Sequence, residues 1–246
     1  PTPLDEARDP DLKYVVSTCR HISQVLRPGQ LVVLESTTYP TTTRDVVVPI
    51  LETENMKAGE DFLIAYSPER EDPGNPDFSA AGIPKVVGGI NDVSLDCASK
   101  LYETAVAGVI PVSNCEVAEA AKVIENIQRD LNIALINEIA VLCDNLSISS
   151  KDVLKAASTK WNFVNFKPGL VGGHCIAVDP MYLLFKSNKF KFPNDIIYSS
   201  QKINKFMSKF IINKIPFEKN KNNSTLILGL AFKQNCKDTR NSGVFD

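Results

Sequence analysis

The sequence lacks several features that would assign it to other classes of protein. No apolar stretch approaches the roughly 20 residues of a membrane-spanning helix, so we expect no membrane segment. The formal net charge is only -2 over 246 residues, which argues against a nucleic-acid partner. Residues 1–11 are polar and rich in proline, unlike a signal peptide. What remains is an ordinary globular composition, 43% hydrophobic and 23% charged.

Cysteine and histidine occur, but not in the patterns of a metal centre. The six cysteines show no C-x-x-C spacing, which argues against a metal site or a disulfide framework and indicates a reducing, cytoplasmic location. His174 adjoins Cys175, which suggests a Cys–His hydrolase. Residues adjacent in sequence seldom point at each other, however, and His21 is the one other histidine. We therefore do not expect that arrangement.

The dinucleotide-binding pattern G-x-G-x-x-G is also absent. That turn seats a pyrophosphate at the start of a helix, so these residues alone do not establish a nucleotide cofactor. The chain begins with Pro-Thr-Pro, like a loop leaving a strand, and ends soon after an apolar run, Thr225 to Leu230. We expect an internal segment of a longer protein, with a complete but irregular chain as the alternative.

The first half of the sequence alternates between helix and strand patterns. Apolar residues recur at a helical period in one set of segments and form short continuous runs in another. The expected helices are 11–26, 44–51 and 92–105, and the expected strands are 31–34, 62–66, 85–88 and 109–112. This alternation favours an α/β fold, with an open sheet and crossover helices. We expect a partial Rossmann-like domain over residues 1–112.

A long helix is expected next, from Ser113 to about Asn145, without Pro or Gly. Ser113 and Glu116 fit a capping box at its start. Its apolar stripe comprises Val117, Ala120, Ile124, Ile127, Leu131, Leu135, Ile139 and Leu142. A helix of roughly 30 residues exceeds the usual length, and such helices commonly join two domains or pack against a twin. We therefore expect a homodimer through this helix.

Two further helices are expected after it, 151–158 and 195–215. With the long helix they form a central helical domain over residues 113–216. A strand at 225–232 would open a second Rossmann-like domain over residues 217–246.

The segment from Gly172 to Pro180 carries the strongest chemical signal. Cys175 follows two glycines, which allow close backbone approach to a ligand, and Asp179 follows four residues later. This pattern predicts a nucleophilic thiol with an acid–base group beside it. The alternative is an ordinary loop with a buried thiol.

Three other places offer polar groups for such a reaction. Lys122 and Asn126 are four residues apart on the long helix and share a face, where the alternative is a solvated surface. The loops Glu35–Pro40 and Ser67–Pro76 each follow a predicted strand, and ligands of open α/β sheets lie beyond strand carboxyl ends. Glu69 could position a water molecule there; the alternative is a charged surface turn.

Taken together, these motifs resemble those of the UDP-sugar 6-dehydrogenases, in the UDP-glucose/GDP-mannose dehydrogenase family. The resemblance covers nearly the whole chain, and its motifs occur in the family's order. They are Pro1–Leu4, Glu35–Pro40, Ser67–Pro76, Lys85–Gly89, Lys122–Glu138, Gly172–Pro180 and Leu228–Arg240. The form of Ser67–Pro76 looks most like the branch that acts on UDP-N-acetylglucosamine.

The resemblance implies an NAD-dependent oxidation of a sugar C6 alcohol to a carboxylate, through a thioester on Cys175. It implies that Lys122 and Asn126 stabilise the oxyanion and that Asp179 is the acid–base group. Glu69 and Thr37 would hold the hydrolytic water and assist proton transfer. The implied cofactor contacts are Thr2, Thr37 and Arg240, and the implied UDP-sugar contacts are Gly172, Gly173, Phe232 and Lys233.

Two positions depart from the family's pattern. Thr41 stands where the family has glycine, and Ala177 stands where it has proline. Together with the expected truncation of the chain, they motivate one alternative, a degenerate copy that only dimerises. Within the enzyme class, the alternatives are a UDP-glucose or a UDP-N-acetylmannosamine 6-dehydrogenase.

Overall fold

The fold was obtained as a computed structural model. It describes residues 2–70, 80–215, 226–231, 239, 242, 244 and 245, without the side chains of residues 80, 174 and 175. The chain forms two compact units. The first comprises Pro1–Glu125 with Val178–Phe192, and the second comprises Asn126–Ala177 with Pro193–Asp246.

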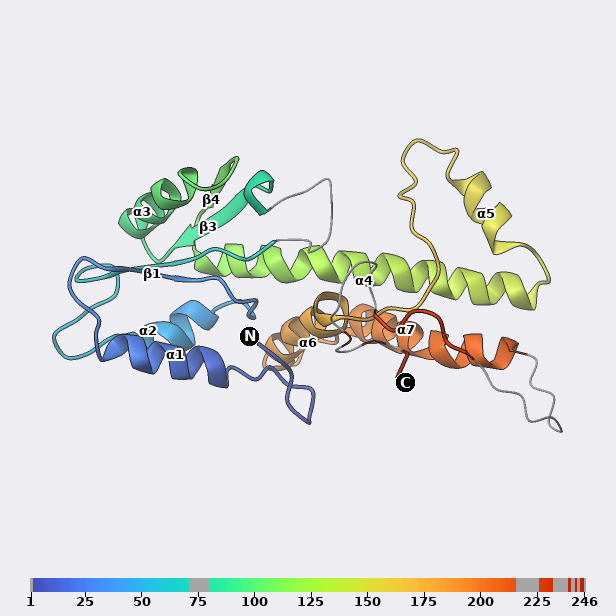
Figure 1. Ribbon diagram of the computed structural model, residues 1–246, viewed down its shortest axis with the longest axis horizontal. Helices are drawn as coiled ribbons and strands as arrows, with labels where there is room; N and C mark the ends of the chain where they lie inside the picture. Colours follow the sequence, from blue (N-terminus) through green and yellow to red (C-terminus); the bar gives the residue numbers. More distant parts are fainter. Residues whose placement is uncertain are drawn as a thin grey trace. The chain divides into compact units, whose positions relative to one another are not determined.

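The described elements alternate in type before they become helical. In chain order they are α1 (Lys13–Ser23), β1 (Leu31–Leu34), the π-helix η1 (Thr43–Val47), α2 (Val48–Leu51), β2 (Leu63–Tyr66), the 3-10 helix η2 (Ala80–Gly82), β3 (Lys85–Gly89), α3 (Asp92–Glu103), β4 (Val109–Val112), α4 (Cys115–Asn145), α5 (Ser150–Ala157), α6 (His174–Asn188) and α7 (Asp195–Lys214). Figure 1 labels most of them. The expected α/β class is confirmed.

The first unit is built on a four-stranded sheet in the order β1-β2-β3-β4. β1 pairs with β2 in parallel, with Leu31 opposite Leu63, and β3 pairs with β4 in parallel. β2 and β3 are antiparallel, with Ala65 opposite Gly89. The sheet is therefore mixed, and its antiparallel step lies between β2 and β3, where the sequence predicted no helix.

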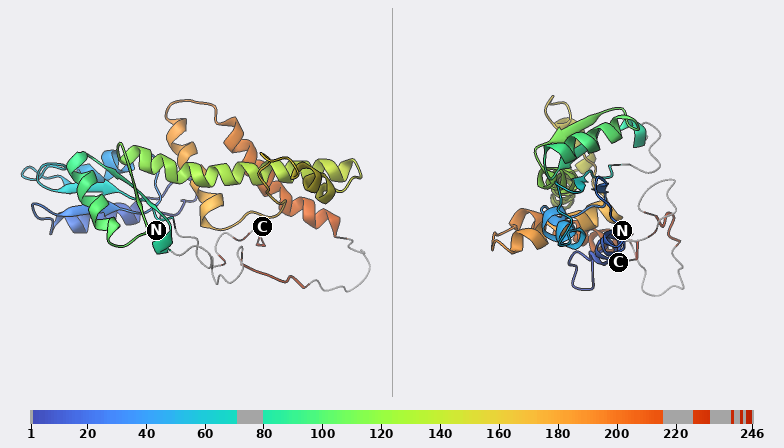
Figure 2. Two further views of the ribbon diagram at one scale, coloured as in Figure 1. Left: turned by 90° about the horizontal axis from the view of Figure 1, so that it is seen from above. Right: turned by 90° about the vertical axis from the view of Figure 1, so that its left-hand side faces the viewer.

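Successive side chains of each strand serve opposite faces of the sheet. On one face, Ala65 and Val87 pack with Ala98 of α3. On the other face, Ile64 packs with Val15 and Cys19 of α1 and with Leu51 of α2. Figures 1 and 2 show α3 on one side of the sheet and α1 with α2 on the other. Helices on both faces explain why these strands read as short apolar runs.

Two glycines at the end of β3 allow the starts of two helices to approach the sheet. A Cβ on Gly88 would lie 2.2 Å from the carbonyl oxygen of Asn114, and one on Gly89 would lie 2.4 Å from the backbone nitrogen of Leu95. Both contacts are with backbone, which cannot move aside easily. A side chain at either glycine would push α3 or α4 away from the sheet.

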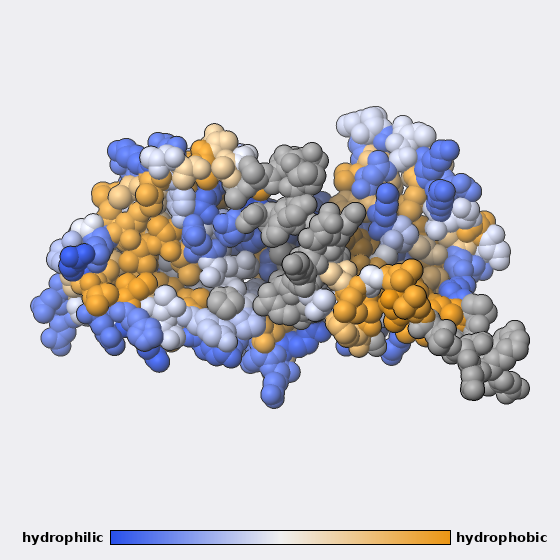
Figure 3. Space-filling model, viewed as in Figure 1, coloured by the Kyte–Doolittle hydropathy of each residue, from blue (hydrophilic) through white to orange (hydrophobic). Residues whose placement is uncertain are grey.

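The edge strand β1 is only half-buried. Between it and α1 lies a hollow of about 230 Å³ lined by Val15, Ile22 and Val32, among others. Figure 3 shows an apolar surface on this part of the molecule.

The long helix α4 has the expected bounds but a different cap and a different buried face. Its cap is Asn114, whose Oδ1 accepts the backbone N–H of Val117 at 2.9 Å, so the predicted capping box at Ser113 is wrong. The predicted apolar stripe is only partly buried: Ile127 is buried, whereas Ile124 is 53% and Leu135 55% exposed. The buried side of the helix combines apolar residues such as Val123 and Ile136 with polar ones.

Helix α6 was not among the expected helices, and it contains Pro180, a residue that usually ends or kinks a helix. The structure shows how the proline is tolerated. Proline has no N–H to give to the carbonyl of Ile176 four residues earlier. The Nε2 of Gln201 on α7 donates to that carbonyl instead, at 3.4 Å.

Two smaller expectations are also corrected. The predicted helix 44–51 is a π-helix followed by α2, since Pro49 has no N–H to continue a regular α-helical pattern. The strand expected at 225–232 is not found at residues 226–230, where Leu226 and Leu228 are 81% and 85% exposed. A strand needs a partner for its backbone groups, and no described segment pairs with this one.

Among the described residues, none of the helices combines the length and the apolar character that a bilayer-spanning helix needs.

Candidate functional site

The two loops predicted to face one crevice do lie side by side. The backbone N–H of Ser67, just after β2, donates to the carbonyl of Leu34 at the end of β1, at 3.0 Å. The N–H of Glu69 donates to the carbonyl of Glu35 at 3.2 Å. Hydroxyl-bearing Ser36 and Thr37 follow directly. The carboxyl ends of the parallel strands β1 and β2 thus form one polar edge, where ligands of such sheets bind.

A buried lysine ties these loops together. The Nζ of Lys85, at the start of β3, lies 3.1 Å from Oε1 of Glu35 and 3.8 Å from Oε2 of Glu69. The hydroxyl of Tyr102 donates to the same Glu35 oxygen at 2.5 Å. Partial burial acts to raise the pKa of Glu35, but the bonds from Tyr102 and Lys85 outweigh it and hold that pKa below its ordinary value. Glu35 therefore remains an anion next to Glu69.

Lys122 and Asn126 are buried, with 8% and 5% exposure. They lie one turn apart on α4 and share a face. The solvated-surface alternative is therefore wrong for both residues. Buried lysine is uncommon, and a cation on a face with an amide can stabilise a developing oxyanion.

The predicted nucleophile and its acid–base partner lie on one helix. Cys175 stands in the first turn of α6 and Asp179 one turn later. Asp179 is only 4% exposed, and the side chain of Cys175 lies outside what the structure describes. Gly173, immediately before the helix, has a φ of 86°, a conformation that favours glycine. This explains the need for glycine before the helix; Gly172 is half-buried.

Helix α6 also contacts the segments that carry two predicted cofactor residues. The hydroxyl of Tyr182 donates to the carbonyl of Thr2 at 2.8 Å. The ring of Phe185 packs on that of Tyr39 with centroids 5.3 Å apart, and Tyr39 is two residues beyond Thr37. Within the first unit, the later turns of α6 therefore support both the Thr2 and the Thr37 segments.

Three predicted contacts lie outside the described residues: Phe232, Lys233 and Arg240. The part of the Ser67–Pro76 loop beyond Arg70 also lies outside them.

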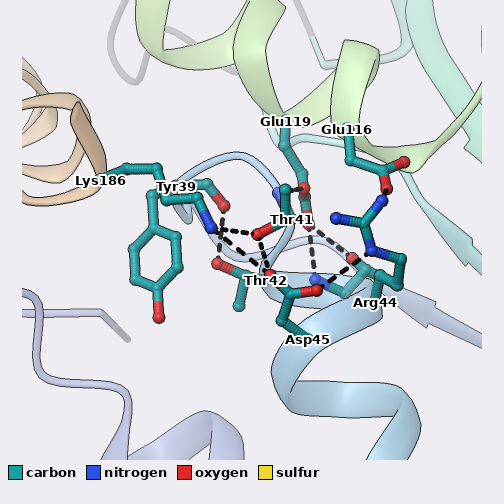
Figure 4. A network of polar contacts seen from close by, with 9 residues as sticks. Tyr39, Thr41, Thr42, Arg44, Asp45, Glu116, Glu119 and Lys186 are labelled. Atoms are coloured by element: carbon teal, nitrogen blue, oxygen red, sulfur yellow. Dashed lines mark hydrogen bonds and ion pairs between the residues drawn. The ribbon is translucent and has the colours of Figure 1, made fainter. Parts of the chain in front are cut away.

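A buried carboxylate that the sequence analysis did not single out holds the segment after Pro40. Glu119 of α4 is fully buried. Its Oε2 accepts the backbone N–H of Thr41 at 2.6 Å, and its Oε1 accepts the N–H and the hydroxyl of Thr43 at 2.8 and 2.7 Å. Figure 4 shows this network, with Arg44 reaching Glu116 beside it. The spacing Glu119, Lys122, Asn126 on one helix face was the available signal.

Burial raises the pKa of Glu119 to about 7, against an ordinary value of 4.5, and the nearby charge of Glu116 acts in the same direction. The hydrogen bonds from Thr43 and Thr41 favour the ionised form and act the other way. The carboxyl group therefore titrates near neutral pH.

The second unit uses the same device on the following turns of α4. Asp130 accepts hydrogen bonds from Ser200 at 2.6 Å and from Asn204 at 2.7 Å, both on α7. The side-chain amide of Asn137 donates to the carbonyl of Gly169 at 3.0 Å and accepts its N–H at 2.8 Å. The loop that leads to Gly172 is thereby fixed to α4.

Comparison with known proteins gives two matches that follow one another along the chain. Residues 1–106 match the NAD binding domain of the UDP-glucose/GDP-mannose dehydrogenase family, and residues 116–206 match the central domain of the same family.

Individual relatives agree with these matches. The chain is 43% identical to UDP-N-acetyl-D-glucosamine 6-dehydrogenase of Pseudomonas aeruginosa, over 100% of the chain and 60% of the relative. It is 36% identical to UDP-N-acetyl-D-mannosamine dehydrogenase of Methanococcus maripaludis, over 98% of the chain and 56% of the relative. The solved structure of UDP-D-ManNAc dehydrogenase from Pyrococcus horikoshii matches with a TM-score of 0.86 and 33% identity, over 99% and 59% of the two chains. The chain thus spans about three fifths of these relatives' length.

The titration of Glu119 predicts a pH-dependent stability. Because the pKa is raised in the folded state, the folded protein binds the proton more tightly, and stability falls as pH rises from 4.5 to about 7. The Glu119→Gln variant lacks this titration. We expect the parent to lose a few kcal/mol, at most about 3, relative to the variant across that window. Thermal midpoints of both proteins at pH 5 and pH 8 measure the difference.

The matched control is Glu103→Gln, at the exposed end of α3. It should leave the pH dependence of the parent intact. An equal change in midpoint between pH 5 and 8 for the parent and Glu119→Gln would show that Glu119 does not titrate as described.

Proposed function

Because the chain belongs to the UDP-glucose/GDP-mannose dehydrogenase family, we propose that its whole protein is an NAD-dependent dehydrogenase of a UDP-N-acetylhexosamine. The reaction is the four-electron oxidation of the sugar's C6 alcohol to a carboxylate, with UDP-N-acetylglucosamine as the favoured substrate. The observation that carries this proposal is the burial of Lys122 and Asn126 on one face of α4. Burying a lysine and an amide costs free energy, and a role in the reaction explains why the protein bears that cost.

The proposed reaction uses covalent capture of an aldehyde. After the first oxidation, the thiolate of Cys175 adds to the aldehyde carbon and forms a C–S bond. Lys122 and Asn126 stabilise the oxyanion that develops on the sugar oxygen. Oxidation of this thiohemiacetal gives a thioester. Water then attacks the thioester carbon, the C–S bond breaks, and the carboxylate is released with the thiol restored.

The remaining proposed roles concern protons and water. Asp179, one turn from Cys175, exchanges the proton of the thiol or of the sugar hydroxyl. Glu69 and Thr37 hold the hydrolytic water at the polar edge of β1 and β2. Covalent capture keeps the reactive aldehyde from escaping and holds its carbon in place for the second oxidation.

In the proposed function, NAD lies along this polar edge, where hydroxyl and backbone groups can bind its polar atoms. The hydroxyls of Ser36 and Thr37 and nearby backbone groups lie at the carboxyl ends of parallel strands, and Thr2 belongs to a second segment supported by Tyr182. The chemistry supplied by NAD is the uptake of two electrons in each of the two oxidations. The chain's own contribution is to orient the cofactor through Thr2 and Thr37.

We favour UDP-N-acetylglucosamine because of the resemblance of Ser67–Pro76 to the branch that acts on it. The relatives are named for UDP-N-acetylglucosamine and for UDP-N-acetylmannosamine. Relatives named for UDP-N-acetyl-D-mannosamine keep that sugar as the alternative within the class, and UDP-glucose is a further alternative.

We also propose that the protein is cytoplasmic, because Cys19, Cys97, Cys115 and Cys143 are free thiols.

The non-catalytic alternative rested partly on Thr41. That residue is accommodated by hydrogen bonds from its backbone and its hydroxyl, so its presence does not indicate decay of the site.

The homodimer is proposed on an apolar groove of the second unit. α4 and α7 form a shallow hollow of about 290 Å³, lined by Leu131, Leu135, Ile196 and Ile203, among others. Leu135 is 55% and Ile196 73% exposed. Large apolar side chains gathered in one groove are typical of a protein interface, and a second copy of α4 and α7 has the matching apolar surface.

The substrate assignment is tested with the full-length protein and three UDP-sugars. We expect two NADH per UDP-N-acetylglucosamine, with a higher kcat/KM than for UDP-N-acetylmannosamine or UDP-glucose. A higher kcat/KM for one of the others would replace the substrate, and no NADH from any of them would reject the proposed function.

Replacing Cys175 tests the covalent step. Cys175→Ser should lower the rate of acid formation at least about a thousandfold, because a serine hydroxyl is a far weaker nucleophile than a thiolate. Product acid is measured directly by mass spectrometry. Cys97→Ser, at a half-buried position on α3, is the matched control and should keep the parental rate. Acid formation by Cys175→Ser at the parental rate would refute the thioester.

The dimer is tested by a charge in the groove. Leu135→Asp should convert the protein to monomers in light scattering after size-exclusion chromatography, because an unpaired carboxylate is costly to bury at an interface. Arg129→Asp, on the other side of α4, is the control and should remain dimeric. A dimeric Leu135→Asp would place any interface elsewhere.

A further inference from the structure

Thr41 has a backbone conformation that threonine rarely adopts. Its φ is 81°, in the left-handed region where a β-branched side chain is strained and glycine is favoured. Residues stay in such conformations only where their surroundings hold them, and these positions gather at functional sites. The contacts of Thr41 therefore indicate what maintains the strain.

Every polar atom of Thr41 has a partner. Its N–H donates to Oε2 of Glu119 at 2.6 Å, and its carbonyl accepts the N–H of Asp45 at 2.8 Å. Its hydroxyl donates to Oδ2 of Asp45 at 2.5 Å and accepts from Nζ of Lys186 at 2.5 Å. A glycine would keep the two backbone bonds and lose both hydroxyl bonds. The hydroxyl is thus what threonine adds at a position where glycine would be unstrained.

The hydroxyl joins elements that are distant in sequence. Asp45 lies on η1 and Lys186 on α6, and Nζ of Lys186 also lies 3.4 Å from Oδ2 of Asp45. Glu119, on α4, holds the backbone of the same residue. Figure 4 shows Thr41 between the side chains of Lys186, Asp45 and Glu119.

Aromatic contacts reinforce this junction. Nζ of Lys186 lies 5.6 Å from the ring centroid of Tyr39, within reach of a cation–π interaction. The Lys186 side chain is only 15% exposed. A partly buried cation that contacts a hydroxyl, a carboxylate and a ring has little freedom to move.

Each of the joined elements carries a residue of the proposed reaction. Thr37 precedes Thr41 by four residues, Lys122 follows Glu119 by three on α4, and Asp179 precedes Lys186 by seven on α6. The contacts of Thr41 therefore join the three segments that carry these residues.

We propose that the hydroxyl of Thr41, bound by Asp45 and Lys186, is a positioning group that holds the Thr37 segment against α6 for catalysis. The proposal rests on the proposed dehydrogenase function, and it goes beyond that function because none of Thr41, Asp45 and Lys186 takes part in the chemistry itself. Thr41 acts through Thr37 and Asp179, so its loss affects the rate of the bound complex more than substrate affinity.

The test compares Thr41→Gly, Thr41→Ser and Lys186→Met in the full-length protein, well below the thermal midpoint. We expect Thr41→Gly to lower kcat about tenfold or more with a KM within about threefold of the parent, because small misplacements are costly to rate. Thr41→Ser keeps the hydroxyl and should retain most of the parental kcat. Relief of backbone strain alone would predict the opposite, a glycine variant at least as active as the parent.

Lys186→Met should lower kcat by a similar factor, and the double variant Thr41→Gly/Lys186→Met should be no slower than either single variant. Lys100→Met is the matched control, because Lys100 forms an exposed pair with Asp96 on α3, and it should keep the parental kcat. Three results would each overturn the proposal. They are a parental kcat in Thr41→Gly, an equal loss of kcat in Thr41→Gly and Thr41→Ser, and a double variant whose loss of kcat is the product of the two single losses.

If the parent protein is inactive, the proposed function is rejected. The positioning role of the Thr41 hydroxyl is then tested by a second measurement that does not need activity. Hydrogen exchange followed by mass spectrometry reports the order of residues 36–45. Faster exchange there in Thr41→Gly and Lys186→Met, but not in Thr41→Ser, supports the role of the hydroxyl. Equal exchange in the parent and all three variants overturns it.

Discussion

The order of the first unit depends on a carboxylate that water does not reach. Glu119 has no exposed surface, and an isolated buried carboxylate is strongly unfavourable. It is tolerated because two backbone N–H groups and one hydroxyl converge on it from Thr41 and Thr43. The same bonds satisfy the backbone of a segment that turns away from β1 and has no strand partner of its own. The carboxylate and the turn thus require each other, which fixes the route of the chain after Pro40.

The long helix repeats this arrangement along its buried side. Asp130 binds Ser200 and Asn204, and Asn137 binds the backbone of Gly169. An apolar helix face buries area without choosing one neighbour, whereas a buried hydrogen-bonding group is satisfied only by a partner in the right place. The polar side of α4 therefore positions loops, which are otherwise the least constrained parts of a fold, and its exposed apolar side remains available for association.

The use of the polar side of α4 to position loops fits the chemistry that we propose. A thiol that captures an aldehyde needs its neighbours placed to within fractions of an ångström, and loops alone rarely provide that. Here the loops that end β1 and β2 are joined by backbone bonds and by Lys85. The Thr37 segment is held by Glu119 and by the hydroxyl of Thr41, while Cys175 and Asp179 share one helix, so their spacing is set by helical geometry. Thr41 is integrated into this support by the side chains of Glu119, Asp45 and Lys186.

Local pattern by itself determined the α/β class, the strand 31–34, the long helix to Asn145 and the motif around Cys175, since period and motif order depend on neighbours in sequence. It did not determine the helix through Pro180, because the missing N–H is compensated by Gln201 of another helix. It left a solvated face open as the alternative for Lys122 and Asn126, because helical spacing shows that two residues share a face but not whether that face is buried. The antiparallel β2–β3 pair and the network of Glu119 belong to the same group. Each depends on which segments meet in space, and only the tertiary structure decides that.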